Sequence, residues 1–100
     1  MNTENIDKQY DKHQELCDEL HKTFIQKNKA YGDSFKQSVE RWGLVAAATR
    51  MDDKHNRIDN LIMNADIDWG DESLSDSLMD LANYCIMTKM ILDERKINRD

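Results

Sequence analysis

Carboxylate and carboxamide side chains recur at helical spacing in two stretches of this sequence. Asp76, Asp80 and Asn83 share one stripe of an expected helix, because each residue advances about 100° around a helix axis. Asp53 and Asn56 lie close together in a second helical stretch. Oxygen ligands from two facing helices suit a hard divalent ion, which in turn bridges phosphate oxygens and polarises water. The pattern predicts a Mg²⁺ site between antiparallel helices.

The apolar residues around these carboxylates indicate that they lie near other protein. Beyond Asp80, the acidic stripe continues into Met87, Met90 and Ile91. A second stripe of the same helix consists of Leu74, Leu78, Leu81, Cys85 and Leu92. A helix that is apolar on more than one side is usually packed on more than one side. Because carboxylates are rarely buried without a partner, a proton or a metal, we expect Asp76 and Asp80 to have one.

Basic and aromatic side chains supply candidates for binding an anionic, aromatic ligand. Lys29, Lys54 and Arg57 would neutralise phosphates, although a solvated face with local ion pairs is the simpler interpretation of such charges. Tyr31 and Trp42 flank the clearest loop and would stack on a base, although Trp42 is also a candidate core residue. These residue types favour a nucleotide as the ligand.

Three further side chains with reactive chemistry are predicted to be structural. Cys17 and Cys85 lack zinc-like spacing and fall on apolar helical faces, so we expect buried free thiols rather than a disulfide. His55 points to an apolar face and is expected to be a core histidine rather than a ligand. None of the three is assigned to the site.

Composition narrows the class of protein. The 100 residues are 34% charged and 39% hydrophobic, contain three glycines and no proline, and carry a formal net charge of −6. This predicts one all-α domain and argues against binding long nucleic acids through a basic surface. No signal peptide and no apolar run long enough for a bilayer is present, so we expect a cytoplasmic protein without a membrane partner.

Helix boundaries follow from apolar periodicity and from two glycines. Gly32 and Gly43 interrupt the pattern, Asp33 or Ser34 is a candidate N-cap, and Asp71 is a candidate N-cap for the last helix. The predicted helices are Asp7–Ala30, Phe35–Trp42, Leu44–Met63 and Glu72–Lys96. With residues 1–6 and 97–100 frayed, they predict a small antiparallel bundle of three long helices and one short helix. Its remaining apolar face predicts a homo-oligomer.

Several segments of the sequence together resemble known families. The segments are Lys27-Asn28-Lys29-Ala30-Tyr31-Gly32-Asp33-Ser34-Phe35, Trp42-Gly43, Arg50, Asp53-Lys54, Glu72-Ser73-Leu74 and Asp80-Leu81-Ala82-Asn83-Tyr84. They resemble a phage and bacterial family, the nucleotide modification associated domain, type one, over about Thr23 to Ile91. Glu72 to Asp76 followed by Asn83 also resembles the third helix of MazG-like all-α NTP pyrophosphohydrolases. The resemblance implies an α-helical domain that handles nucleotides.

The first functional hypothesis is a Mg²⁺-dependent pyrophosphohydrolase acting on an NTP or a modified dNTP. Asp53, Asp76 and Asp80 would hold the metal, with Asp76 and Asp80 also counted as catalytic. Glu72 would be a peripheral ligand or orient the attacking water. Asn56 and Asn83 would hydrogen-bond the ligand or water.

The second hypothesis is a phage protein that sequesters a nucleotide or a cyclic nucleotide without turnover and so counters host defence, in the host cytoplasm. It is motivated by two departures from the MazG-like pattern, since Asn56 replaces a carboxylate and Ser73 stands where a metal-binding glutamate is expected. A third hypothesis is a helical interaction protein whose carboxylates form only salt bridges.

Overall fold

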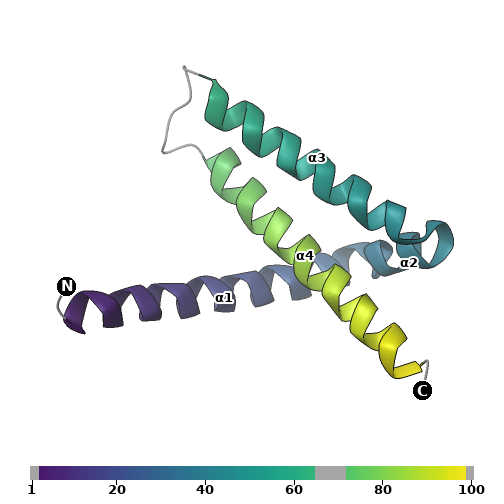
Figure 1. Cartoon of the computed structure of the whole chain (residues 1–100), viewed down its shortest axis with the longest axis horizontal. Helices are drawn as coiled ribbons and strands as arrows, with labels where there is room; N and C mark the ends of the chain where they lie inside the picture. Colours follow the sequence, from purple (N-terminus) through teal and green to yellow (C-terminus); the bar gives the residue numbers. More distant parts are fainter. Residues whose placement is uncertain (1–2, 65–71, 99–100) are drawn as a thin grey trace. The chain divides into compact units, whose positions relative to one another are not determined.

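A computed structural model describes residues 3–64 and 72–98, with side chains to residue 96. Its four helices are α1 (Thr3–Tyr31), α2 (Ser34–Trp42), α3 (Leu44–Met63) and α4 (Glu72–Asn98) (Figure 1). The prediction of an all-α chain with three long helices and one short helix is confirmed for the residues described, which include no strand. Within these ranges, no helix combines the length and the apolar character needed to cross a bilayer.

The predicted helix boundaries agree with the structure at most ends. The bounds of α3 match the prediction, and α2 begins one residue earlier than predicted. α1 begins at Thr3, four residues before the predicted Asp7, and α4 continues to Asn98. The predicted cap Asp71 lies outside the described residues. Helix ends commonly differ by one or two residues between methods, so these shifts change no argument about the site.

The chain divides into two compact units, Met1–Gly32 and Asp33–Asp100. The first unit is α1, which has no buried residue. Its side-chain contacts are local, such as the ion pair between Lys12 Nζ and Glu15 Oε2 at 3.5 Å. Such exposed pairs one turn apart contribute only tenths of a kcal/mol to helix stability.

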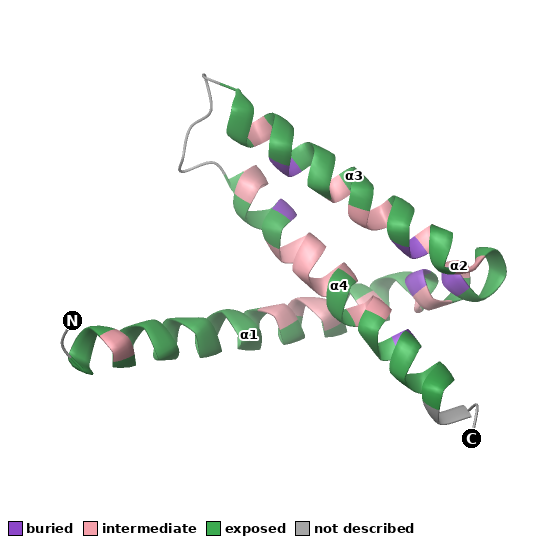
Figure 2. Ribbon diagram, viewed as in Figure 1, coloured by how far each residue is buried: buried purple, intermediate pink, exposed green. Residues whose placement is uncertain are grey.

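The second unit has a small core where α2, α3 and α4 meet (Figure 2). Its buried members are Phe35, Val39, Ala47 and Ile91, and Ala46, Met51, Tyr84 and Met87 pack against them. The rings of Phe35 and Tyr84 stack with centroids 5.4 Å apart, an arrangement favoured over a face-to-face sandwich. This core holds the middle of α4 beside α3, which runs alongside it in Figure 1.

Gly43 makes the sharp break between α2 and α3. Its φ of 83° lies in the left-handed region, where a side chain would be strained. Its N–H donates to the carbonyl of Val39 at 2.7 Å, and its carbonyl accepts from the N–H of Ala46 at 3.0 Å. Asp33 stands at the N-cap position of α2 as predicted, yet its side chain makes no capping hydrogen bond, because its backbone is itself left-handed, with φ 60°.

An ion pair links α2 to the far part of α4. Lys36 Nζ lies 3.2 Å from Glu94 Oε2. The hydrogen bond to Glu94 and its negative charge raise the pKa of Lys36 above the ordinary value of 10.5. Both side chains remain substantially exposed to solvent, so the contact orients the two helices more than it stabilises them.

The face of α4 that packs on α3 differs from its leucine stripe. Leu78 and Leu92 are 50% and 44% exposed, whereas Ser77 is 2% and Ile91 8% exposed. The packed side therefore follows Ser77, Asp80, Tyr84, Met87 and Ile91, whereas Asp76 and Met90 of the acidic stripe are exposed. Along this side, α3 offers Ala46, Ala47 and Met51 to the apolar residues of α4, and Lys54 and Arg57 to Asp80 and Ser77.

Candidate functional site

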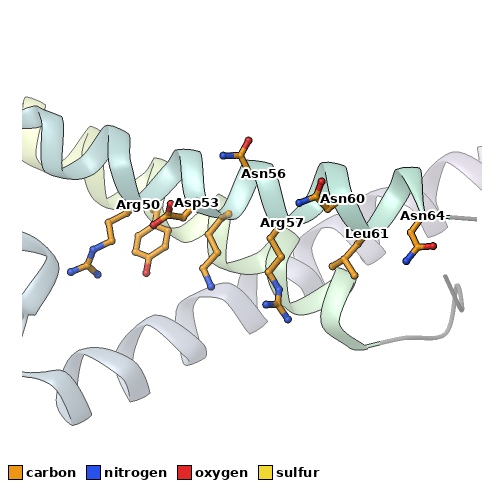
Figure 3. Close-up of a pocket in the computed structure, with 9 residues that line it drawn as sticks. Arg50, Asp53, Asn56, Arg57, Asn60, Leu61 and Asn64 are labelled. Carbon is orange, nitrogen blue, oxygen red and sulfur yellow. The ribbon is translucent and has the colours of Figure 1, made fainter. Parts of the chain in front are cut away.

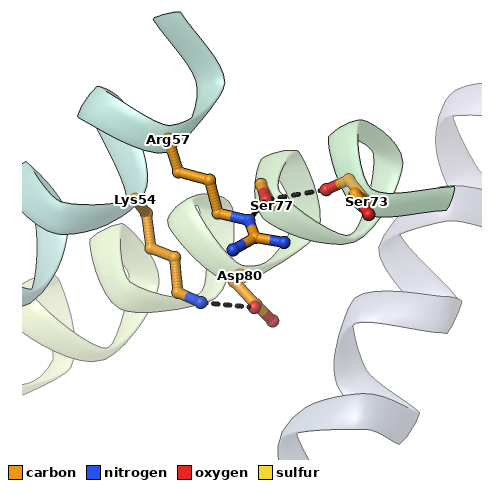
Figure 4. A network of polar contacts seen from close by, with 5 residues as sticks. All are labelled: Lys54, Arg57, Ser73, Ser77 and Asp80. Carbon is orange, nitrogen blue, oxygen red and sulfur yellow. Dashed lines mark hydrogen bonds and ion pairs between the residues drawn. The ribbon is translucent and has the colours of Figure 1, made fainter. Parts of the chain in front are cut away.

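A polar seam joins α3 to the first half of α4 (Figure 4). Lys54 Nζ of α3 lies 3.0 Å from Asp80 Oδ2 of α4, and the side chains are 29% and 19% exposed. One turn along α3, the Nε–H of Arg57 donates to Ser77 Oγ at 3.1 Å. The Ser77 hydroxyl donates in turn to the carbonyl of Ser73 at 2.7 Å. The seam fixes the direction of two cationic side chains of α3.

An open groove of about 710 Å³ lies along this seam (Figure 3). The residues that line it are Arg50, Asp53, Lys54, Asn56, Arg57, Asn60, Leu61, Asn64 and Tyr84. All but Tyr84 and Asn64, the C-cap residue of α3, come from α3 itself, and Figure 3 shows Arg50, Arg57 and Leu61 extending from the same side of that helix. The lining therefore combines three cations, three carboxamides, one carboxylate and a phenol ring.

The spacing of the cations explains why they share the groove. Arg50, Lys54 and Arg57 follow one another at steps of four and three residues, so they lie on one helical face. At a rise of 1.5 Å per residue, the three cations extend over about 10 Å along the axis of α3. In a chain of net charge −6, this face is a local concentration of positive charge. Guanidinium groups donate two parallel hydrogen bonds to phosphate, and an ammonium acts as a point charge.

The three predicted metal-binding carboxylates have different surroundings. Asp53 lines the groove, Asp80 is half-buried and paired with Lys54, and Asp76 is exposed. Hence Asp80 has the protein partner expected of it, and the same expectation is wrong for Asp76. Within residues 3–64 and 72–98, no three His, Cys, Asp or Glu side chains are arranged to hold a metal ion. A site built from all three carboxylates stays a prediction, since Mg²⁺ is commonly held by one or two carboxylates together with substrate phosphates.

The other predicted site residues are spread over the helices. Glu72 is exposed at the start of α4, and Asn83 is half-buried on that helix. Asn56 lines the groove, but its Nδ2 donates to Asp52 Oδ2 at 3.3 Å. Lys29 and Tyr31 lie on α1, in the first unit, and both are exposed.

Several expectations of burial are wrong. Trp42 is 66% exposed, with the guanidinium of Arg41 5.2 Å from its ring centroid, so it is not a core residue. His55 is exposed and its Nδ1 lies 3.3 Å from Asp59 Oδ2. Cys17 and Cys85 are free but exposed, not buried.

The sequence reasoning missed the part of the groove that Asn60, Leu61 and Asn64 form. A signal was present, because Asn56, Asn60 and Asn64 recur at four-residue steps, which places Asn56 and Asn60 toward one side of α3 and Asn64 at its C-cap. Arg50 entered only through the family resemblance, although it lies one turn before Lys54.

Residues 27–92 match the sequence profile of a family described as nucleotide modification associated domain 1. The matched segment is well over half of the chain and contains every residue that lines the groove. Neither the comparison with curated proteins nor the comparison with solved structures finds a match.

Proposed function

The chain belongs to the nucleotide modification associated domain 1 family, and from this premise we propose that its α3–α4 groove binds a nucleotide. One observation carries the proposal, namely that Arg50, Lys54 and Arg57 line the same groove from one face of α3. A ligand with several anionic oxygens has the charge that complements these three cations. This interpretation needs no long nucleic acid and no membrane as a partner.

Two of the three cations are held in place before any ligand arrives. Arg57 donates one of its five N–H groups to Ser77, which is 2% exposed. The other four N–H groups of the guanidinium can donate to phosphate oxygens. Lys54, which also lines the groove, is held by its ion pair with Asp80. A side chain positioned beforehand loses less conformational freedom on binding, which favours affinity.

Titration calorimetry with ATP tests this proposal. Arg50→Ala should weaken ATP binding about tenfold or more, because a hydrogen bond to a charged group contributes about 1.5–3 kcal/mol. Lys89→Ala is the charge-matched control, since Lys89 forms its own ion pair with Asp93 outside the groove. Failure of the wild-type protein to bind any nucleotide would contradict the proposal, as would equal effects of the two substitutions.

Pyrophosphohydrolysis is the second candidate function, and the position of Asp53 in the groove beside the three cations favours it. Bound with the nucleotide, Mg²⁺ would neutralise phosphate charge and lower the pKa of a coordinated water. Asp53 would hold the ion, and Asp80 would become a second ligand if Lys54 paired with the phosphates instead. Asp76 and Glu72 remain the predicted further ligand and water-orienting group, and Asn83 a donor to the ligand.

The two functions make different predictions for turnover and for metal dependence. A hydrolase should release pyrophosphate from at least one NTP or dNTP in the presence of Mg²⁺, and Asp53→Asn should abolish that release. A sequestering protein should bind in EDTA and return the ligand intact when the protein is denatured by heat. Chromatography of the released nucleotide separates these outcomes directly.

A further inference from the structure

We propose that α1 pairs in antiparallel orientation with α1 of a second copy of this chain, and so forms a homodimer. The inference does not depend on nucleotide binding. It follows from the spacing of the side chains of α1, from their exposure and from the distribution of charge along the helix. Most of α1 also precedes residues 27–92, the segment that matches the family, so the family match gives this helix no role.

α1 carries one stripe with the spacing of a coiled coil. The stripe advances at alternating steps of four and three residues along most of the helix, through Ile6, Tyr10, His13, Cys17, Leu20, Phe24, Lys27 and Tyr31. Six of these eight residues are hydrophobic. A repeat of this period over more than three heptads keeps one face of a helix toward a partner helix. The contact of 3.8 Å between His13 Nδ1 and Cys17 Sγ confirms that two positions of the stripe are neighbours.

The stripe has no partner within its own unit. Among the described residues 3–32 of that unit, α1 is the only helix, and it has no buried side chain. Tyr10 and Tyr31, near the two ends of the stripe, are 66% and 68% exposed. Because a helix in a protein gains most of its stability from packing of its apolar face, α1 requires a partner of its own.

The charges of α1 indicate what that partner is. Residues 4–19 hold six carboxylates and two lysines, whereas residues 22–31 hold three lysines and no carboxylate. A parallel pair of α1 helices would place ends of like charge beside each other. An antiparallel pair places the acidic part of each helix beside the basic part of the other, and it also sets the two helix dipoles in opposite directions. A second α1 in the reversed direction therefore complements the first.

The stripe is self-complementary in one antiparallel register. Every position then faces another position of the stripe on the second copy, in the pairs Cys17 with Leu20, His13 with Phe24, Tyr10 with Lys27 and Ile6 with Tyr31. Lys27 meets the ring of Tyr10, which favours a cation–π contact, and Asp7 follows one turn away. The same patch serves both copies, as a closed two-fold dimer requires.

Sedimentation velocity of the full chain measures this pairing. We expect the wild-type protein to sediment with twice the chain mass of 11.8 kDa and to dissociate on dilution. Leu20→Glu places two carboxylates near the middle of the interface and should give a monomer at concentrations where wild type is a dimer. Ile25→Glu is the matched control, because Ile25 is also apolar and lies off the stripe, and this variant should remain a dimer.

Cysteine chemistry tests the orientation and does not depend on the folding of Leu20→Glu. In chains with Cys17→Ser and Cys85→Ser, a mixture of Tyr10→Cys and Lys27→Cys chains should form a disulfide-linked dimer on mild oxidation, and neither chain should do so alone. In the wild-type protein, Cys17 should react with a thiol reagent more slowly as the protein concentration rises, because the dimer covers it. The rate at Cys85, which lies on α4, should stay constant.

Four results would overturn the proposal. The first is a wild-type chain that stays monomeric, and a lower stability of Leu20→Glu in that monomer would show that α1 covers its own chain instead. The second is a dimer that survives Leu20→Glu, which would place the interface on another surface. The third is cross-linking of Tyr10→Cys chains with one another, which would mean a parallel pair. The fourth is a reaction rate of Cys17 that does not change with protein concentration.

Discussion

Replacing Asp80 with asparagine separates a structural role of the Lys54–Asp80 pair from its role at the groove. The substitution keeps the shape of the side chain and removes the charge that lies 3.0 Å from Lys54 Nζ. Exposed ion pairs contribute up to about 1 kcal/mol, whereas removing one partner of a fully buried pair costs about 3–5 kcal/mol. With side chains 29% and 19% exposed, this pair lies between those limits.

We therefore expect Asp80→Asn to lower the free energy of unfolding by about 1.5 kcal/mol, after allowance for screening by solvent. For a domain of this size, that loss corresponds to a decrease in Tm of about 6–12 °C. Urea unfolding of the single variants Asp80→Asn and Lys54→Met and of the double variant should give a coupling energy of about 1 kcal/mol. Asp76→Asn serves as the stability control, because Asp76 is exposed and its effect should stay within about 0.5 kcal/mol.

The same substitution should have the opposite effect on phosphate binding. Without Asp80, Lys54 has its full charge available to a ligand, so ATP affinity measured in EDTA should increase several-fold. Two results would refute this reasoning. The first is an unfolding free energy equal to that of wild type, and the second is a loss of ATP affinity in EDTA, which would mean that Asp80 contacts the ligand.

Three further predictions test the packing of the structure. Val39→Ala removes two methylene equivalents from a side chain that is fully buried and should cost about 2 kcal/mol in urea unfolding; a cost below about 0.5 kcal/mol would contradict the position of the core. Because its folded pKa is raised, Lys36 contributes stability through Glu94 that is fully present below pH 10.5 and is lost as the pH rises through the folded pKa. Lys36→Met should therefore show a shallower alkaline decrease in melting temperature than wild type, and parallel curves would count against the ion pair. Cys17 and Cys85 are exposed, so both should react with a thiol reagent in native buffer; reaction only after denaturation would show that they are covered.

The sequence determined the local structure of this protein. A chain without proline, with apolar residues at three- and four-residue steps, has few alternatives to helix, and Gly32 and Gly43 are placed where the helices stop. The grouping of Lys54 with Arg57 was also visible, because residues three apart share a helical face whatever else the chain does. These features depend on contacts between near neighbours in sequence.

Only the tertiary structure decided which of the available faces would be buried and which charges would meet. Periodicity identified two candidate stripes on α4, but the side that packs on α3 carries Asp80 and Ser77, which pair with Lys54 and Arg57, together with the core residues Tyr84, Met87 and Ile91. The same choice left Leu78, Cys85 and Leu92 exposed. Helix periodicity specifies directions around an axis, but the energy of a face depends on the partner opposite it, and that partner comes from a distant part of the chain.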